Sequence, residues 1–577
     1  MLFSRVALCH ALLAWSAVAK PILTNENRIE WKPCEFEDDR QGDGPLECGN
    51  LTVPLDYTNH ESDDRFIVEL LRSRAIRSSS RGSVLLNFGG PGSDGVKNIR
   101  FGSSSLHNGT GKTLTFSCFD TADERNDFYQ LWPYIATRGP ASWDEFEVDI
   151  AWTWAFEQTF SNQCLRRNED SQVGKVIGTT FVARDMIQIV DALGEDGLLR
   201  FLGFSYGSIL GVTVAAMFPD RIDRMVLDGV VNAFNYYNTA SIDGDGALSV
   251  DAAYHAILAE CIMAGFPSCP LAETFANVTE YENYTLSDKV QVLQQLLEMR
   301  FERLRRSPIV YGLTIILPTY GLILRDALIE QRYATNFELT KSLQFLIMNM
   351  EEGIPYVIET IKKVMKGRAE ESSDGNESFD GIHCGDKSGP HARLESFQEV
   401  KSRAWQAIGV TQVWAFRVGT FFTGCAKWPF ESKERFDTNI LLRDGGIKTR
   451  FPILFTAPTY DTRTSIHSAR NMSTYFDNSV VLEVKGYGHC TGTQDSECHT
   501  KATNEYFLDG ILPEDGTICN IDGPLFEPPE NSTQPAPEEQ LNQSLALAGR
   551  MVWEGRQQNL WSITSTYQRH GRHLIAP

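Results

Sequence analysis

The sequence is short of positive charge. Its 577 residues carry 53 Lys and Arg against 75 Asp and Glu, so the formal net charge is −22. An acidic surface repels phosphates, which argues against nucleic acid as a partner. The simplest interpretation of the acidity is solubility in an acidic extracellular setting.

Long apolar runs are also missing. A helix needs about 20 apolar residues to span a bilayer, and no stretch of the chain reaches that length. No apolar tail closes the sequence, so we expect neither a membrane span nor a lipid anchor. At the N-terminus, Arg5 precedes the short apolar run 6–15, and Ala17-Val18-Ala19 matches the small-x-small cleavage pattern. We interpret residues 1–19 as the signal peptide of a secreted, extracellular protein.

Motifs for cofactors and metals are incomplete. No Gly-Lys-Ser/Thr closes the glycine-rich loop 89–92. Gly111-Lys112-Thr113 ends like a phosphate-binding loop, but Leu106 stands where the first glycine is required. We therefore expect no cofactor and no metal. A group of His and Cys near the C-terminus also fits no zinc spacing: His489, Cys490, Cys498 and His499.

Cysteines and glycosylation motifs agree with secretion. Setting aside Cys9 in the leader, eleven of the 12 cysteines remain. This odd number leaves at least one unpaired, while disulfides are the default for the rest in an oxidising compartment. Beside the signal peptide, eight Asn-x-Ser/Thr motifs indicate a glycoprotein: Asn50, Asn108, Asn277, Asn283, Asn376, Asn471, Asn531 and Asn542.

Short apolar runs alternate with helical patterns, which predicts an α/β protein with a mostly parallel central sheet flanked by helices. From 232 to 448 the pattern changes to long amphipathic helices, which predicts an inserted helical lid. The core would then comprise 20–231 and 449–521, followed by a flexible tail over 522–577. The strands expected are 51–57, 66–71, 83–88, 199–203, 224–228, 451–456 and 480–484.

Ser205 is the candidate nucleophile. It stands in Gly203-Phe204-Ser205-Tyr206-Gly207, after a predicted strand and before a helix rich in small residues. A strand, a sharp turn and a helix form a nucleophile elbow, whose crowding favours glycine. The helix N-terminus would stabilise a developing oxyanion. The alternative is a glycine-rich helix start that Ser205 merely caps.

A serine hydroxyl becomes a nucleophile when a base removes its proton, and in this arrangement the chain order is Ser, acid, His. Asp461 follows the predicted strand 451–456, and His489 follows one helix and one strand later. We expect His489 to act as general base and Asp461 to orient it. Asp228, at the end of another predicted strand, is the alternative acid, but we expect it rather to support the site or a loop. Two further histidines, which we expect at the surface, are His467 and His499.

The loop after the strand 83–88 would supply half of an oxyanion hole. Its backbone donors would be Gly89 or Gly90, paired with the N–H of Tyr206. Glycine lets the backbone approach a substrate closely.

Together these motifs resemble the tripeptidyl-aminopeptidase-like branch of the prolyl-aminopeptidase family of α/β-hydrolases, over about residues 30–520. Ser205, Asp461 and His489 fall on the family's triad positions, although Thr462 stands where the family usually has Pro. The resemblance implies peptide substrates, cleaved from a free N-terminus under a lid that limits access. The matching pieces are Trp31-x-x-Cys34, Cys48, Val53-Pro-Leu-Asp-Tyr57, Gly89-Gly-Pro-Gly92, Gly203-Phe-Ser-Tyr-Gly207, Leu227-Asp-Gly229, Asp461, Gly488-His489, Tyr506-Phe-Leu-Asp-Gly510, Leu512-Pro and Cys519.

The resemblance and the short loops together imply a disulfide scheme in which Cys490 stays free. With Cys490 beside His489, we expect a thiol reagent to modify the native enzyme there and to slow it. Spacing alone does not settle the connectivity. The implied pairs are Cys34–Cys48, Cys118–Cys164, Cys261–Cys269, Cys384–Cys425 and Cys498–Cys519.

The segment 93–108 departs from the family pattern, which has a helix and a central strand there. Its few apolar residues do not form the continuous run of a central parallel strand. We expect a gap or an irregular segment beside the strand that carries Ser205. A real deletion and an error in the assembled coding sequence are both open explanations.

The sequence favours a secreted serine exopeptidase that forms an acyl-enzyme on Ser205. Two alternatives stay open: a carboxylesterase or lipase-like enzyme, since the same triad hydrolyses esters, and a catalytically impaired homologue that only binds. The lid is rich in both acids and aromatics, so it does not decide between them. The length of peptide removed and the oligomeric state are not set by the sequence.

Overall fold

The computed structural model describes most of the chain between residues 28 and 527. Three predicted features lie outside the described residues: the signal peptide 1–19, the segment 93–108, and residues 528–577 of the tail. The described ranges are 28–35, 46–73, 81–92, 113–129, 143–239 and 247–527, the last with gaps at 277, 313, 317, 349, 373–375, 390–391, 393–395, 409–410, 412, 414–424 and 426.

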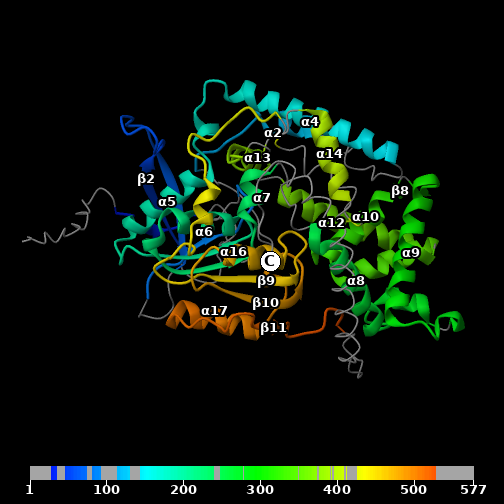
Figure 1. Ribbon diagram of the computed structural model, residues 1–577. Coiled ribbons are helices and arrows are strands. Elements are labelled where there is room, and N and C mark those ends of the chain that lie inside the picture. The colour runs from blue at the N-terminus through cyan, green and yellow to red at the C-terminus, as the bar shows by residue number, and fades with distance from the viewer. Residues whose placement is uncertain are drawn as a thin grey trace, which may run out of the picture.

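A six-stranded parallel sheet lies at the centre of the molecule (Figure 1), in the order β11-β10-β9-β6-β5-β4. Parallel neighbours need long crossover connections, which are helical here. This is the α/β fold that the alternating pattern predicts. The strands are β4 (Leu85–Asn87), β5 (Leu199–Phe204), β6 (Ile222–Asp228), β9 (Leu454–Tyr460), β10 (Val480–Tyr487) and β11 (Ile518–Asn520).

Helices from both halves of the chain pack on this sheet. Helix α6 is deeply enclosed, because its residues from Tyr206 to Ala216 are all buried. Helix α5 has its apolar residues at helical spacing and buries the face that they form. The helices beside the sheet include α5 (Thr179–Leu193), α6 (Tyr206–Met217), α16 (Ile466–Ser473) and α17 (Glu497–Asp509).

The first strands form a sheet of their own. β1 (Lys32–Pro33), β2 (Leu46–Pro54) and β3 (Arg65–Ser73) pair antiparallel and do not join the central sheet. The central sheet ends, within the described residues, at β4. The expectation of a gap beside β5 is therefore wrong, because β5 pairs with β4 on one side and with β6 on the other.

Between β6 and β9 the regular elements of the described chain are helices, apart from one short hairpin. Helices α8–α12 build a hydrophobic core of their own, whereas residues of α13 and of 425–447 belong to the core beside the sheet. The predicted lid 232–448 thus contains two differently packed parts. Its elements are α7 (Ala233–Asn238), α8 (Ala247–Ala264), α9 (Leu286–Arg306), β7 (Ile309–Tyr311), β8 (Thr314–Ile316), α10 (Pro318–Glu330), α11 (Asn336–Met348), α12 (Ile354–Ser372), α13 (Asn376–Gly385) and α14 (Phe397–Ile408).

The remaining described helices are α2 (Ala122–Tyr129) and α4 (Trp143–Asn168). Leu525 and Phe526 are buried in the α8–α12 core, so the chain stays packed beyond residue 522, where the flexible tail was expected to begin. Of the helices in the described part of the chain, none combines the length and the apolar character needed to cross a membrane.

Candidate active site

Ser205 lies at a sharp turn between β5 and α6. Its backbone has φ 54° and ψ −119°, a conformation that non-glycine residues adopt rarely. A Cβ on Gly203 would lie 2.5 Å from the Phe201 ring and 2.7 Å from the Gly207 carbonyl carbon. The turn therefore requires glycine at 203. This geometry is the nucleophile elbow that the motif predicts.

Asp461 directly follows β9 and contacts His489, which follows β10. His489 Nδ1 lies 3.0 and 3.1 Å from the two carboxylate oxygens. The carboxylate is fully buried and accepts further hydrogen bonds from the backbone N–H groups of Arg463, Thr464 and Cys490. Burial alone would raise the pKa of Asp461, but attraction to His489 and these hydrogen bonds hold its pKa below the usual value. Asp461 is thus ionised and aimed at the imidazole.

The Ser205 turn and the His489 loop meet at the end of β6. The Ser205 N–H donates to the Asp228 carbonyl at 2.9 Å, and the Cys490 thiol donates to the same oxygen at 3.7 Å. Among the hydrogen bonds of the described residues, none joins the Ser205 hydroxyl to His489. Such bonds are often loose in the absence of substrate.

Of the three predicted oxyanion-hole residues, Gly89 is placed differently from the expectation. Its N–H donates to the Asn87 side chain at 3.0 Å, so it is already engaged. Glycine is needed at position 89 because a Cβ there would lie 2.9 Å from Ser205 Cβ. Gly90 follows in the same loop, and Tyr206 is the first residue of α6, where a backbone N–H has no partner within the helix.

The buried carboxylate of Asp386, which lies near Tyr206, was not predicted from the sequence. The Tyr206 hydroxyl lies 2.7 Å from the Thr179 hydroxyl, and Thr179 donates through both its N–H and its hydroxyl to Asp386. Tyr236 donates to the same carboxylate at 2.9 Å. Burial raises the pKa of Asp386 to about 6, against these hydrogen bonds. Asp386 lies 181 residues from Ser205 in sequence, and no local pattern marks it.

The alternative site residues are also placed by the structure. Asp228 binds the backbone and hydroxyl of Thr491 and does not contact His489, which removes it as the acid partner. His499 is half-buried and lies 3.2 Å from the Thr491 hydroxyl, so the expectation that it is a surface residue is wrong. His467 lies in the first turn of α16.

All five predicted disulfides are formed, and Cys490 is free. The expectation that a thiol reagent modifies the native protein at Cys490 conflicts with the structure. The thiol is fully buried, and burial together with the nearby Asp228 and Asp461 raises its pKa well above the ordinary value.

Asp461, His489 and Cys490 place three potential metal-ligand atoms within 4.8 Å of one another. Their chemistry does not suit a metal. The Asp461 carboxylate is occupied by His489 and several N–H donors, and Cys490 keeps its proton. A thiolate ligand would have to ionise in a buried site beside two carboxylates.

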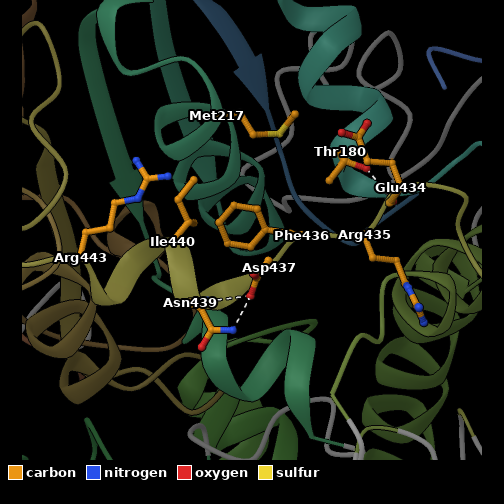
Figure 2. Close-up of a pocket in the computed structure, with 9 residues that line it drawn as sticks. All are labelled: Thr180, Met217, Glu434, Arg435, Phe436, Asp437, Asn439, Ile440 and Arg443. Carbon is orange, nitrogen blue, oxygen red and sulfur yellow. Dashed lines mark hydrogen bonds between the residues drawn. The ribbon is translucent and has the colours of Figure 1, made fainter.

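A pocket of about 410 Å³ opens on the surface away from this site (Figure 2). It lies between Met217, the last residue of α6, and Phe436, whereas Ser205 precedes the first residue of that helix. Twelve helical residues span about 18 Å. The pocket is therefore separate from the predicted site residues.

Two family models match the chain. Residues 137–246 match the α/β hydrolase fold, and residues 411–519 match the TAP-like proteins. These segments contain Ser205 and both Asp461 and His489, respectively.

Similar curated proteins agree with these matches. Serine protease Hip1 of Mycobacterium tuberculosis is 26% identical over 513 residues, covering 85% of this chain and 91% of that protein. Tripeptidyl aminopeptidase of Streptomyces lividans is 29% identical over 252 residues, covering 39% and 45%. The putative hydrolase YuaR of Escherichia coli is 29% identical over 259 residues, covering 42% and 49%. Together with the parallel sheet, these matches show an α/β-hydrolase fold, and they support a serine hydrolase similar to the TAP-like proteins.

Proposed function

We propose that the protein is a secreted serine exopeptidase that removes residues or short peptides from free N-termini. The observation that carries the proposal is the buried Asp461–His489 pair beside the strained turn at Ser205. The names of its relatives, a serine protease and a tripeptidyl aminopeptidase, support a peptidase. The lid buries carboxylates, among them Asp326, of the kind that holds a substrate ammonium group.

The reaction would proceed through an acyl-enzyme. His489 takes the proton of the Ser205 hydroxyl as its oxygen bonds to the scissile carbonyl carbon. The resulting oxyanion accepts hydrogen bonds from Gly90 and Tyr206. The C–N bond then breaks, and His489 returns the proton to the leaving amine. Water, deprotonated by His489, finally hydrolyses the ester and frees Ser205.

Secretion and glycosylation belong to this proposal. The signal-peptide pattern at 1–19 and the five disulfides support export, since disulfides persist in oxidising compartments. Three of the eight glycosylation motifs have an exposed Asn in the described chain: Asn50, Asn283 and Asn471.

A substrate panel with a Ser205→Ala control tests the function. A fluorophosphonate probe should label the parent and not Ser205→Ala, which should still fold and lose several orders of magnitude in turnover. Free peptidyl-amides should be cleaved, and their N-acetylated forms nearly not at all, because a buried lid carboxylate then loses its charged partner. Equal rates on free and blocked peptides, or turnover of short esters alone, would contradict the exopeptidase.

A further inference from the structure

The end of β6 carries a second buried polar network beside the Asp461–His489 pair. The Asp228 carboxylate, only 2% exposed, accepts the Thr491 N–H at 3.0 and 3.1 Å and the Thr491 hydroxyl at 2.6 Å. Thr491 follows His489 by two residues. The carboxylate therefore binds the loop that carries the candidate base, without touching the base itself.

The main chain of the same residue binds the candidate nucleophile. The Asp228 carbonyl accepts hydrogen bonds from the Ser205 N–H at 2.9 Å and from the Cys490 thiol at 3.7 Å. The main chain of Asp228 thus binds the Ser205 turn, and its side chain binds Thr491, 286 residues further along the sequence than Ser205. Both segments have to be held for His489 to face Ser205.

The His489 loop requires such external support. Cys490 has φ 67°, in the left-handed region that L-residues seldom adopt. Its N–H donates to Asp461 at 3.0 Å, and the next residue is held by Asp228. The two residues that follow His489 are therefore fixed by two different carboxylates.

The network continues outward to α17. The Thr491 hydroxyl gives its proton to Asp228, so its oxygen can accept from His499 Nε2, 3.2 Å away. Thr503 lies 3.4 Å from the same nitrogen, and the backbone N–H of His499 donates to Ser496. Burial raises the pKa of Asp228, and the charge of His499 and the bonds from Thr491 oppose this rise.

We propose that Asp228 is a positioning residue that sets His489 against Ser205, its carboxylate fixing the histidine loop through Thr491 while its carbonyl fixes the serine turn. This inference rests on the proposed roles of Ser205 and His489. It assigns Asp228 no contact with substrate and no part in proton transfer. Its loss would lengthen the path between base and nucleophile, and a misplacement of about 1 Å can cost roughly 100-fold in rate.

The test compares Asp228→Ala, Asp228→Asn and Thr491→Val with the parent, using p-nitrophenyl butyrate and a fluorophosphonate. These probes do not depend on peptide specificity. Turnover is expressed per Ser205 labelled, so that misfolded protein does not count. We expect Asp228→Ala to lower kcat and the labelling rate about 100-fold, with KM within about twofold. We also expect the pH profile of labelling to shift, because His489 has moved.

The kcat of Asp228→Asn should be at least about tenfold higher than that of Asp228→Ala, since its amide oxygen still accepts the Thr491 N–H. Thr491→Val, which keeps the backbone bond, should lower kcat about tenfold. The matched control is Thr213→Val, the same change at a buried hydroxyl that binds Tyr237 away from both loops. It should lower the melting temperature comparably and leave kcat per labelled site unchanged.

A merely structural Asp228 would lower the melting temperature while kcat per labelled site and the pH profile stayed at parental values. That result would overturn the inference and leave the proposed function standing. If Asp228→Ala does not fold, a Thr491→Val enzyme with parental kcat overturns it equally. A parent that neither labels at Ser205 nor turns over the ester overturns both proposals.

Discussion

At Ser205 a residue with a side chain occupies backbone angles that cost on the order of 1–3 kcal/mol. Close packing around the neighbouring glycines supports this conformation. Gly203 packs against Phe201 and Gly207, and Gly89 packs against Ser205 itself. The motif can be recognised in the sequence because this crowding leaves no room for a side chain at these glycines.

Gly203→Ala tests that crowding. The new methyl would meet the Phe201 ring at 2.5 Å and the Gly207 backbone at 2.7 Å, so the turn must shift. We expect a loss of about 1–3 kcal/mol in unfolding free energy and at least about a 100-fold loss in kcat. Thermal denaturation and ester turnover measure the two effects. Gly523→Ala, where nothing lies within 4 Å, should change neither. An unchanged kcat in Gly203→Ala would contradict the inference that the crowding at Gly203 holds the Ser205 turn in place.

Cys490 offers a second test at the same scale. Because its thiol is fully buried and its pKa is raised, iodoacetamide should leave it unmodified in the native protein and alkylate it after unfolding. Peptide mapping of both states measures this. Rapid alkylation of the native protein at Cys490 would show that the loop opens in solution.

Among the elements, the helical lid is attached to the two loops that carry Asp461 and His489. Glu330, at the end of α10, pairs with Arg463 at 2.8 Å, and its carbonyl lies 3.1 Å from where a Cβ of Gly488 would stand. Helix α8 binds the same region, because Tyr487 donates to Glu260 at 3.0 Å. The lid therefore supports the loops of the candidate site.

Glu330→Gln should weaken this attachment. The Glu330 side chain is 2% exposed, so its charge is poorly screened from Arg463. We expect a loss of about 1–3 kcal/mol in stability and a fall in kcat/KM of roughly tenfold. Glu338→Gln is the matched control, since it removes an exposed lid pair with Lys363, which contributes about 0–1 kcal/mol. Equal effects of the two substitutions would contradict a special role for the α10 attachment.

For the whole molecule, an excess of acid makes the folded state sensitive to pH. The net charge of −22 favours expansion as more carboxyl groups ionise. The buried carboxyl of Asp386 acts in the same direction. Burial raises the pKa of Asp386 to about 6 from 3.8, so the folded state holds this proton more tightly than the unfolded state. Its ionisation therefore destabilises the fold as pH rises between these values.

Asp386→Asn should remove that contribution. The parent should lose on the order of 3 kcal/mol relative to the variant between pH 4 and pH 7, and urea denaturation at each pH measures the difference. Asp444→Asn, at an exposed site, changes the net charge equally and should not alter the slope relative to the parent. A constant difference between parent and Asp386→Asn at all pH values would contradict the raised pKa.

The parts of the fold that depend on short-range rules could be predicted from the sequence. The apolar runs located β5, β6 and β10 to within a few residues, because burial in a sheet imposes a pattern on neighbouring positions. The Ser205 turn was predictable from its glycines. The order of Asp461 and His489 followed from one αβ unit between them, which brings both to the same edge of a parallel sheet.

Which distant groups meet could not be predicted from the sequence and is known from the folded structure. Asp386 reaches Tyr206 through Thr179, and Asp228 binds Thr491, over separations that no local pattern records. The pairing of β4 with β5, and the separate sheet of β1–β3, likewise depend on long-range packing. A buried carboxylate requires donors nearby in space, wherever they stand in the chain. Folding supplies those donors, so the polar supports of the site emerge only when the whole core has formed.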